Sequence, residues 1–426
     1  MIDIKLIREK TDYVKNALLK RGLEVDFSEL LHLDEERKRL ISETEALKAK
    51  RNDVSAQIPR LKKEGKEVEG LFREMKDVSE RIKDFDAQLS LTKDRIKDSI
   101  DVLPNIPADE VPAGGKERNE VLRTWGEKPD FDFDALDHID LVTSLKLVDY
   151  ERGVKIGGSG FWLYTGAGAR LEWGLINFFI DEHGRDGYQF ILPPHLLNYE
   201  CGYTAGQFPK FVDDVYQIAG NDSQGRFLLP TSETALINFH RDEVLKEEDL
   251  PLKYFSYTPC YRKEAGSYRA RERGMIRGHQ FNKVEMFQFT RPEDSEKAHE
   301  ELSEKAERLI RQLGLHHRVS LLAAEDCTSA MAKTFDAEVW MPSMEDYIEV
   351  SSISNARDYQ ARRGNIRFKR TSTKKNEFIH SLNASGLATS RLIPAIVEQF
   401  QQSDGSVLVP EVLRSRVGTD RLTIEG

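Results

Sequence analysis

The stretch YRKEAGSYRARERGMIRGHQFNKVEM, residues 261–286, concentrates positive charge in a chain that is acidic overall. The 426 residues carry a formal net charge of −10, yet seven Lys or Arg and three Glu lie between Arg262 and Glu285. Glycines, among them Gly266 and Gly274, interrupt this run, and an alternation of polar and apolar residues closes it. Such a segment predicts a strand, a basic loop and a returning strand.

The two flanking runs define the hairpin. YFSYTPCYRKE predicts a strand that ends near Arg262 and Glu264. HQFNKVEMFQFT predicts the returning strand, on which Phe281, Lys283, Glu285 and Phe287 share one face. An arginine fixed at the end of a strand offers a rigid fork for a phosphate, and a basic loop over 265–277 suits a polyanion. A solvated hairpin held by ordinary cross-strand ion pairs is the alternative.

Beyond residue 130, short β-like runs are clustered and are interleaved with helical windows at 167–183, 296–313 and 390–402. Because these runs do not alternate strictly with helices, the pattern predicts an α+β domain built on a mostly antiparallel sheet with flanking helices. The phosphate-binding patterns GxGxxG and GxxxxGK[ST] are absent from the sequence, so the common nucleotide-binding folds are not indicated.

The first hundred residues have a different texture. Apolar residues recur at heptad spacing from Leu33 to Leu61 and again from Val68 to Ile96, surrounded by Lys and Glu. Pro59, together with two glycines near residues 65 and 70, is expected to end the first helix and turn the chain. The pattern predicts an antiparallel helical hairpin, a coiled-coil arm of two helices of about 30 residues.

The turn of this arm carries a basic cluster that could contact phosphates. Its residues are Arg51, Arg60, Lys62, Lys63 and Lys66. A dimerisation or spacer role is the alternative for heptads alone.

Composition limits the remaining possibilities. Three widely spaced cysteines indicate neither a disulfide framework nor a Cys/His zinc site, and they fit a reducing cytosol. The N-terminus lacks the apolar core of a signal peptide, and no stretch approaches 18 uncharged apolar residues. A segment rich in Pro and Gly suggests three parts: an arm over 1–103, a linker over 104–130 and a catalytic domain over 131–426. We expect a cytoplasmic protein with no membrane association.

Five ordered motifs behind the arm resemble those of seryl-tRNA synthetases, which are class II aminoacyl-tRNA synthetases. DGYQFILPPHLL is similar to motif 1, the stretch around 260–289 to motif 2, and SLNASGLATSRLIPAIVEQFQ to motif 3. LLPTSE is similar to the family's serine-binding motif, and IEVSSISNARDYQARR to its ATP and metal stretch. The resemblance runs from near Met1 to about residue 418.

The resemblance implies a role for each matching residue. Arg262 and Arg391 would be catalytic, with Arg262 on the α-phosphate and the serine carboxylate and Arg391 on the γ-phosphate. The serine site would comprise Thr231, Ser232, Glu233, Arg262, Glu285, Asn383 and Ser385. The ATP site would comprise Arg262, Lys263, Glu264, Phe281, Glu349, Val350, Ser351, Ser352 and Arg391, with Phe281 stacked on the base. Which glutamate takes the serine ammonium and which the hydroxyl is left open.

The same resemblance implies the partners. Magnesium would accompany ATP on Glu349 and Ser352, and no zinc is expected. Arg51, Arg60, Lys62 and Lys63 on the arm and Arg269, Arg271 and Arg273 in the motif 2 loop would contact tRNA. The expected activity is ATP-dependent attachment of L-serine to tRNA(Ser), and to tRNA(Sec) where that exists, by a homodimer.

Two other functions compete with this one. A paralogue that activates an amino acid for a carrier protein is disfavoured, because such relatives tend to lack the arm. A coiled-coil scaffold leaves the ordered motifs unexplained. The chain also departs from the family pattern at Ala384, where motif 3 usually has glycine; a positive φ there would cost alanine about 1 kcal/mol.

Overall fold

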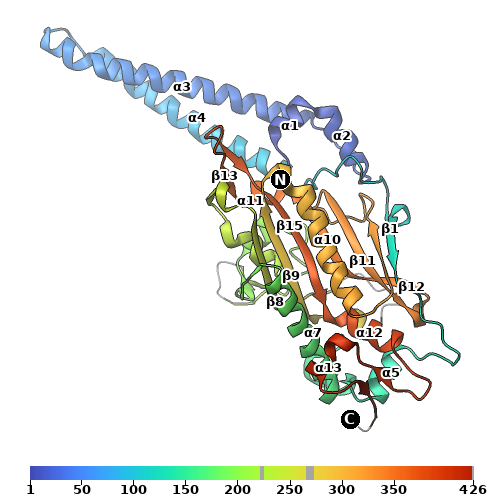
Figure 1. The fold of residues 1–426 in the computed structure, drawn as a ribbon. Helices are drawn as coiled ribbons and strands as arrows, with labels where there is room; N and C mark the ends of the chain where they lie inside the picture. The colour runs from blue at the N-terminus through green and yellow to red at the C-terminus, as the bar shows by residue number, and fades with distance from the viewer. Residues whose placement is uncertain (221–224, 265–272, 425–426) are drawn as a thin grey trace. The chain divides into compact units, whose positions relative to one another are not determined.

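The computed structural model describes residues 1–220, 225–264 and 273–424. The chain divides into two compact units, and Figure 1 shows the elements of both. One unit comprises Ile2–Leu19 and Leu23–Pro104, and the other comprises Met1, Lys20–Gly22 and Asn105–Gly426.

The first unit is built on two long helices, α3 (Ser28–Lys63) and α4 (Glu69–Asp101), preceded by α1 (Ile4–Glu9) and α2 (Thr11–Leu19). Lys48 Nζ lies 3.1 Å from Asp86 Oδ1, and Arg95 Nη2 lies 2.9 Å from Glu29 Oε1, as antiparallel pairing requires. Apolar side chains fill the seam: Leu47 and Val54 of α3 pack against Met75, Val78 and Ile82 of α4. The predicted helical hairpin is therefore confirmed.

Pro59 does not end the first helix, contrary to the sequence prediction. α3 continues through it to Lys63, and the chain turns at Glu64 and Gly65, where Gly65 has φ +69°. A proline near the end of a helix removes one hydrogen bond of the last turns, which a long helix tolerates when its partner helix holds it in place.

The second unit contains an eight-stranded sheet in the order β1-β10-β11-β12-β15-β9-β8-β4. Neighbouring strands pair antiparallel except β4 with β8, which are parallel, so the predicted fold class is confirmed. The strands are β1 (Glu120–Trp125), β4 (Gln189–Phe190), β8 (Leu252–Tyr261), β9 (Gln280–Thr290), β10 (His317–Leu321), β11 (Lys333–Met341), β12 (Asp346–Arg357) and β15 (His380–Ala388).

The segment 104–130, expected as a linker, contributes a strand to this sheet. β1 pairs antiparallel with β10, with Trp125 opposite His317. The prolines and glycines that suggested a linker lie on both sides of this strand. The prediction rested on them and therefore missed the strand formed by EVLRTW.

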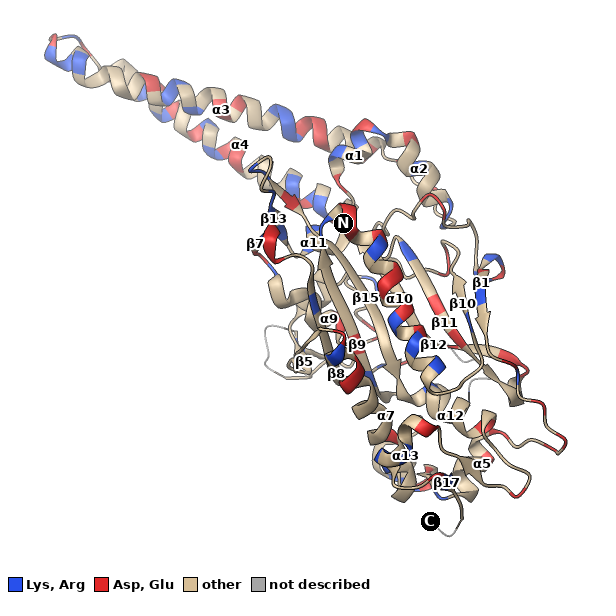
Figure 2. Ribbon diagram, viewed as in Figure 1, with Lys and Arg blue, Asp and Glu red and all other residues tan. Residues whose placement is uncertain are grey.

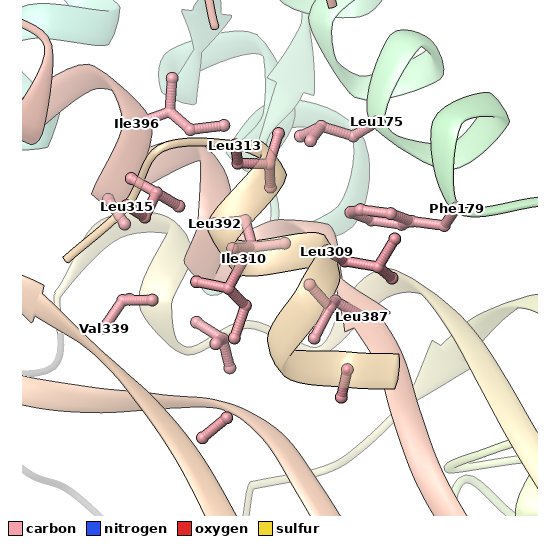
Figure 3. Close-up of a cluster of buried hydrophobic side chains, with 14 of the residues drawn as sticks. Leu175, Phe179, Leu309, Ile310, Leu313, Leu315, Val339, Leu387, Leu392 and Ile396 are labelled. Carbon is pink, nitrogen blue, oxygen red and sulfur yellow. The ribbon is translucent and has the colours of Figure 1, made fainter. Parts of the chain in front are cut away.

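Three helices, α7 (Gly166–Arg185), α10 (Ser295–Gln312) and α12 (Thr389–Gln399), contribute to the main apolar core against the sheet. Figure 3 shows Phe179 of α7, Leu309 of α10 and Leu392 of α12 converging beside Leu387 at the end of β15. Each of these side chains is fully buried, and each such burial stabilises the fold by roughly 1.5–3 kcal/mol.

Shorter elements complete the unit. The remaining helices are α5 (His138–Ser144), α6 (Tyr150–Gly157), α8 (Tyr199–Thr204), α9 (Glu233–Leu236), α11 (Tyr359–Arg363) and α13 (Glu411–Val417). The remaining strands are β2 (Val148–Asp149), β3 (Leu163–Tyr164), β5 (Leu196–Leu197), β6 (Phe227–Leu228), β7 (Val244–Lys246), β13 (Arg367–Lys369), β14 (Asn376–Phe378), β16 (Val407–Leu408) and β17 (Arg421–Leu422).

Candidate active site

At the middle of β9 and β15, apolar side chains face the main core and polar ones face the opposite side of the sheet. On β9, Val284 and Met286 join the main core, so the residues that alternate with them, Lys283 and Glu285, point the other way. On β15, Leu382 and Ala384 join the same core, and Asn383 therefore lies on the polar face. The cross-strand register places Ser385 opposite Glu285. Buried polar groups thus gather at the middle of the sheet.

Two buried carboxylates, Glu233 and Glu285, share one amide. Asn383 Nδ2 lies 2.9 Å from Glu285 Oε1 and 3.4 Å from Glu233 Oε2. Gln360 of α11 donates to Glu233 Oε1 at 2.8 Å, and Ser381 donates to Gln360 Oε1 at 2.7 Å. These hydrogen bonds fix both acids and leave carboxylate oxygens able to accept further donors.

Burial, together with the charge of Glu285, raises the pKa of Glu233 to about 7. The hydrogen bond from Gln360 and the positive charges of Lys283 and Arg262 act in the opposite direction. A carboxylate that ionises near neutral pH inside a protein is typical of a ligand-binding or catalytic site.

Lys283 supplies a buried cation to the same cluster. Its ammonium forms an ion pair with Glu285 Oε2 and donates to Thr231 Oγ1 at 2.7 Å. Thr231 Oγ1 also accepts from the backbone N–H of Glu233 at 3.3 Å, at the start of α9. Two acids and one lysine are therefore held together by groups from three separate segments.

Arg262 stands where two pockets meet. One pocket is lined by Pro230, Thr231, Glu233 and Met331, and the other by Phe281, Glu349 and Arg391; Arg262 and Glu264 line both. Arg262 follows the end of β8, its Nε donates to the Pro230 carbonyl at 3.2 Å, and its guanidinium lies 5.2 Å from the centre of the Phe281 ring. A single guanidinium can thus reach ligands in both pockets.

The second pocket is lined by charged groups that pair with one another. Arg391 of α12 lies 3.2 Å from the Glu349 carboxylate on β12, and Arg277 lies 2.5 Å from the Glu264 carboxylate. Phe281 offers an aromatic face between these pairs. The combination of an aromatic ring, fixed guanidinium groups and an acid suits a nucleotide with its phosphates.

One edge of this pocket could hold a divalent cation together with phosphate oxygens. Glu349 is partly exposed, and Ser352 lies opposite Asp336 in the β11–β12 register. Burial and the nearby Glu349 charge raise the pKa of Asp336, and Asp336 Oδ1 is buried without a hydrogen-bond partner. Within the described residues, no group of three or more His, Cys, Asp or Glu is arranged to hold a metal ion by itself. Magnesium commonly uses one or two protein oxygens plus phosphates, so these residues fit it.

Several residues that the sequence predicted for the site do not line either of the two pockets. Ser351 is buried and donates to the Ser385 carbonyl at 2.6 Å, and Lys263 donates to the Asp213 carbonyl at 3.0 Å. Ser232 is fully buried before α9, whereas Val350 lines the second pocket. Arg273 lies 3.5 Å from Asp137. Arg269 and Arg271 lie outside the described residues.

Ala384 is accommodated without strain. It lies inside β15, paired with Ile353 on one side and Met286 on the other, so its backbone is extended. The departure from glycine in motif 3 therefore carries no conformational cost at this position.

Sequence reasoning assigned no role to three buried residues. Gln360 holds Glu233 and Lys283 pairs with Glu285 in the cluster, while outside it Glu172 of α7 accepts from Asn282 and Thr389, both at 2.7 Å. The strand alternation places Lys283 on the face of Glu285 but does not predict its pairing with that acid. Gln360 and Glu172 come from distant segments that nothing in the sequence pattern brings together.

The first unit carries its own concentration of basic side chains. Figure 2 shows Lys and Arg gathered where α3 turns toward α4. The side chains of Arg60 and Lys66 are 74% and 63% exposed, and both pair with Glu64. Lys62 Nζ lies 5.1 Å from the centre of the Phe72 ring. The tip thus presents cations to solvent, as phosphate recognition requires.

Comparison with known proteins identifies the family. Residues 1–107 match the seryl-tRNA synthetase N-terminal domain, and residues 216–400 match the tRNA synthetase class II core domain (G, H, P, S and T). Serine--tRNA ligase 2 of Clostridium acetobutylicum is 59% identical over 425 residues, covering 99% of this chain and 100% of that protein. The chain belongs to the seryl-tRNA synthetase family.

Solved structures of the family agree with this assignment. The seryl-tRNA synthetase of Pyrococcus horikoshii complexed with ATP is 34% identical, with a TM-score of 0.92 and 99% of each chain covered. The cytoplasmic serine-tRNA ligase of Naegleria fowleri in complex with AMP is 29% identical, with a TM-score of 0.88, and the match covers 100% of this chain and 99% of that one. The helical arm and the class II core follow one another in this chain as the family fold requires. Among the helices of the described residues, none combines the length and the apolar character needed to cross a membrane.

Proposed function

We propose that this chain activates L-serine with ATP in the two pockets joined at Arg262, and then transfers the serine to tRNA(Ser). The observation that carries the proposal is that Arg262 lines both pockets. Adenylate formation brings the serine carboxylate against the α-phosphate, so two anions must approach each other. A fixed guanidinium between them stabilises the charge that develops in the transition state.

The pocket lined by Thr231 and Glu233 binds serine, and Glu285 is joined to Glu233 through Asn383. Glu233 and Glu285 accept from the ammonium and the hydroxyl, while Asn383 holds both acids in place. Thr231 adds a hydroxyl to this pocket, and Ser385, which lies opposite Glu285 in the sheet register, lines the second pocket. A pocket that must hydrogen-bond a hydroxyl leaves its polar groups unpaired around alanine, so discrimination against alanine is expected to reach about 10⁴-fold.

The pocket with Phe281 binds ATP. The adenine stacks on Phe281 beside Glu264, and Arg391 meets the γ-phosphate. Glu349 and Ser352 would hold magnesium, which neutralises phosphate charge during the reaction. The serine carboxylate is already ionised at neutral pH, so Arg262 and Arg391 contribute by orientation and charge and not by proton transfer.

The arm and the motif 2 loop bind tRNA. Exposed Arg60 and Lys62, with Arg51 and Lys63, contact the phosphates of tRNA(Ser), and of tRNA(Sec) where it exists. Arg273, at the end of the motif 2 loop, contacts the acceptor end. Such contacts depend on salt and on RNA shape more than on base sequence.

The second unit also offers a surface for a second copy of the chain. Trp173 of α7 is 53% exposed, and Leu192, in the motif 1 stretch after β4, is 69% exposed. Large exposed apolar side chains are typical of subunit contacts, and we propose a cytoplasmic homodimer in which these two residues are covered. A monomeric mass in light scattering would argue against this arrangement.

The experiment that tests the proposal compares Arg262→Ala with a matched control, Arg123→Ala. Arg123 pairs with Glu307 at 2.7 Å on β1, at the far end of the sheet order. Serine-dependent exchange of pyrophosphate into ATP is expected to fall at least 10²-fold in the first variant and to stay within about two-fold of wild type in the second. Equal exchange rates in both variants would refute the role of Arg262.

A further inference from the structure

Lys283 occupies the place where the proposed serine site and the proposed ATP site adjoin. Its ammonium contacts Glu285 and Thr231 on the serine side. The same residue lines the pocket of Phe281, Glu349 and Arg391 on the ATP side. The residues proposed to bind serine and ATP do not include this lysine, so its place between them needs an explanation.

The contacts that Lys283 makes are those that the substrate ammonium needs. Serine brings an ammonium group to the pair of acids Glu233 and Glu285, and Glu285 Oε2 already pairs with the ammonium of Lys283. Two cations cannot share one carboxylate oxygen without repelling each other. Binding of the serine ammonium at Glu285 Oε2 therefore requires Lys283 to leave that oxygen.

The structure also indicates where the displaced ammonium can go. Lys283 has four rotatable bonds between its ammonium and a strand that is fixed on both sides by β8 and β15. Its side chain is 8% exposed, and the opening that it lines within the described residues is the pocket of Arg262 and Arg391. In a loaded enzyme that pocket holds phosphates, which attract a cation that has lost its carboxylate.

We propose that Lys283 is a substrate-displaced cation: it neutralises Glu285 in the empty site, and the ammonium of serine drives it onto the α-phosphate of ATP. This inference rests on the proposed function. It makes serine binding and phosphate stabilisation one linked event, because the Lys283 cation becomes available to the ATP site only when serine is present. By reciprocity, bound ATP tightens the binding of serine.

Lys283→Met tests this exchange, with Lys253→Met as the matched control. Lys253 is also partly buried and ion-paired, 2.7 Å from Glu301, but on β8 away from either pocket. Three quantities are measured for each variant: the serine dissociation constant without ATP, the same constant with a non-hydrolysable ATP analogue, and kcat for serine-dependent pyrophosphate exchange.

Without ATP, serine is expected to bind Lys283→Met at least as tightly as it binds wild type, because the competing Lys283 ammonium is gone. We also expect kcat to fall at least 10²-fold and the analogue no longer to tighten serine binding. Lys283→Arg, which keeps a cation, is expected to recover part of kcat. A Lys283→Met variant that binds serine ten-fold more weakly would overturn the proposal and make Lys283 a fixed part of the serine pocket. Unchanged kcat would overturn it as well.

Misfolding and failure of the proposed function give different results. A midpoint of thermal unfolding for Lys283→Met within a few degrees of that of wild type shows that the fold is intact. Lys283→Arg, which keeps the positive charge, is the second variant compared. If wild-type protein shows no serine-dependent exchange, the proposed function fails before Lys283 is tested. If wild type exchanges normally and Lys283→Met does too, only the inference about Lys283 fails.

Discussion

Arg391 binds Glu349 at both its main chain and its side chain: Arg391 Nη1 lies 2.8 Å from the Glu349 carbonyl oxygen and 3.2 Å from its carboxylate. The pair joins α12 to β12 across the pocket proposed for ATP. It holds the guanidinium in place before any phosphate arrives, and a donor that needs no rearrangement is the most effective kind for stabilising charge in a transition state.

Replacing Arg391 by alanine should therefore lower kcat for pyrophosphate exchange by about 10²–10³-fold, which corresponds to roughly 3–4 kcal/mol. Arg421→Ala, which removes an exposed guanidinium 3.1 Å from Asp404, serves as control and should leave the rate unchanged. A loss of less than ten-fold in Arg391→Ala would mean that this residue does not meet the reacting phosphates.

Serine use should depend on pH through Glu233. Its pKa of about 7 means that the acid is mostly protonated below that pH and can no longer attract an ammonium by charge. We expect kcat/KM for serine in pyrophosphate exchange to fall as the pH is lowered from 8 to 6, by up to about ten-fold per unit below the pKa. In Glu233→Gln, kcat/KM for serine should be low at every pH, and its pH profile should lack this inflection. An inflection that survives in this variant would assign the titration to another group.

Glu172 should make the protein less stable at high pH. Burial raises its pKa from 4.5 to about 7, so the folded state holds this proton more tightly than the unfolded state does. The stability that this proton contributes is complete below pH 4.5 and is lost as the pH rises to 7, a change of about 3 kcal/mol. Glu172→Gln keeps an acceptor oxygen for Asn282 and Thr389 but cannot ionise.

The midpoint of thermal unfolding of Glu172→Gln is accordingly expected above that of wild type at pH 8, with most of the difference gone at pH 5. Glu172→Ala, which leaves both donors unpaired, should be destabilised at both pH values. A Gln variant that is less stable than wild type at pH 8 would show that the carboxylate is held ionised.

The arm tip should matter for tRNA alone. In Arg60→Ala/Lys62→Ala/Lys63→Ala, KM for tRNA(Ser) is expected to rise at least ten-fold. The slope of the logarithm of the binding constant against the logarithm of the salt concentration should become shallower by about 0.7 for each phosphate that the variant no longer neutralises. Pyrophosphate exchange, which needs no tRNA, should be unchanged. Lys246→Ala/Lys369→Ala/Lys374→Ala removes three exposed lysines from the second unit and should affect neither assay. Equal effects of the two triple variants would point to total charge and not to the arm.

The sequence predicts most of the fold because its signals are local. The heptads fix the antiparallel hairpin, and the alternation in FNKVEMFQFT places Glu285 opposite the core. Prediction fails where packing decides the outcome: Pro59 stays within α3, and EVLRTW joins the sheet as β1 because β10 offers an edge. Motif resemblance located Glu233 and Asn383. It did not show that Asn383 donates to Glu233 across 150 positions of sequence, or that Gln360 donates to Glu233 across 127 positions.

Selective charging is the most direct test of whether this chain attaches serine, and no other amino acid, to tRNA. The full chain is incubated with unfractionated tRNA, ATP, magnesium and each radiolabelled amino acid in turn. Label from serine alone should become acid-precipitable on tRNA, with alanine and threonine at background. Serine that supports pyrophosphate exchange but never reaches tRNA would contradict this function and favour a carrier-charging enzyme.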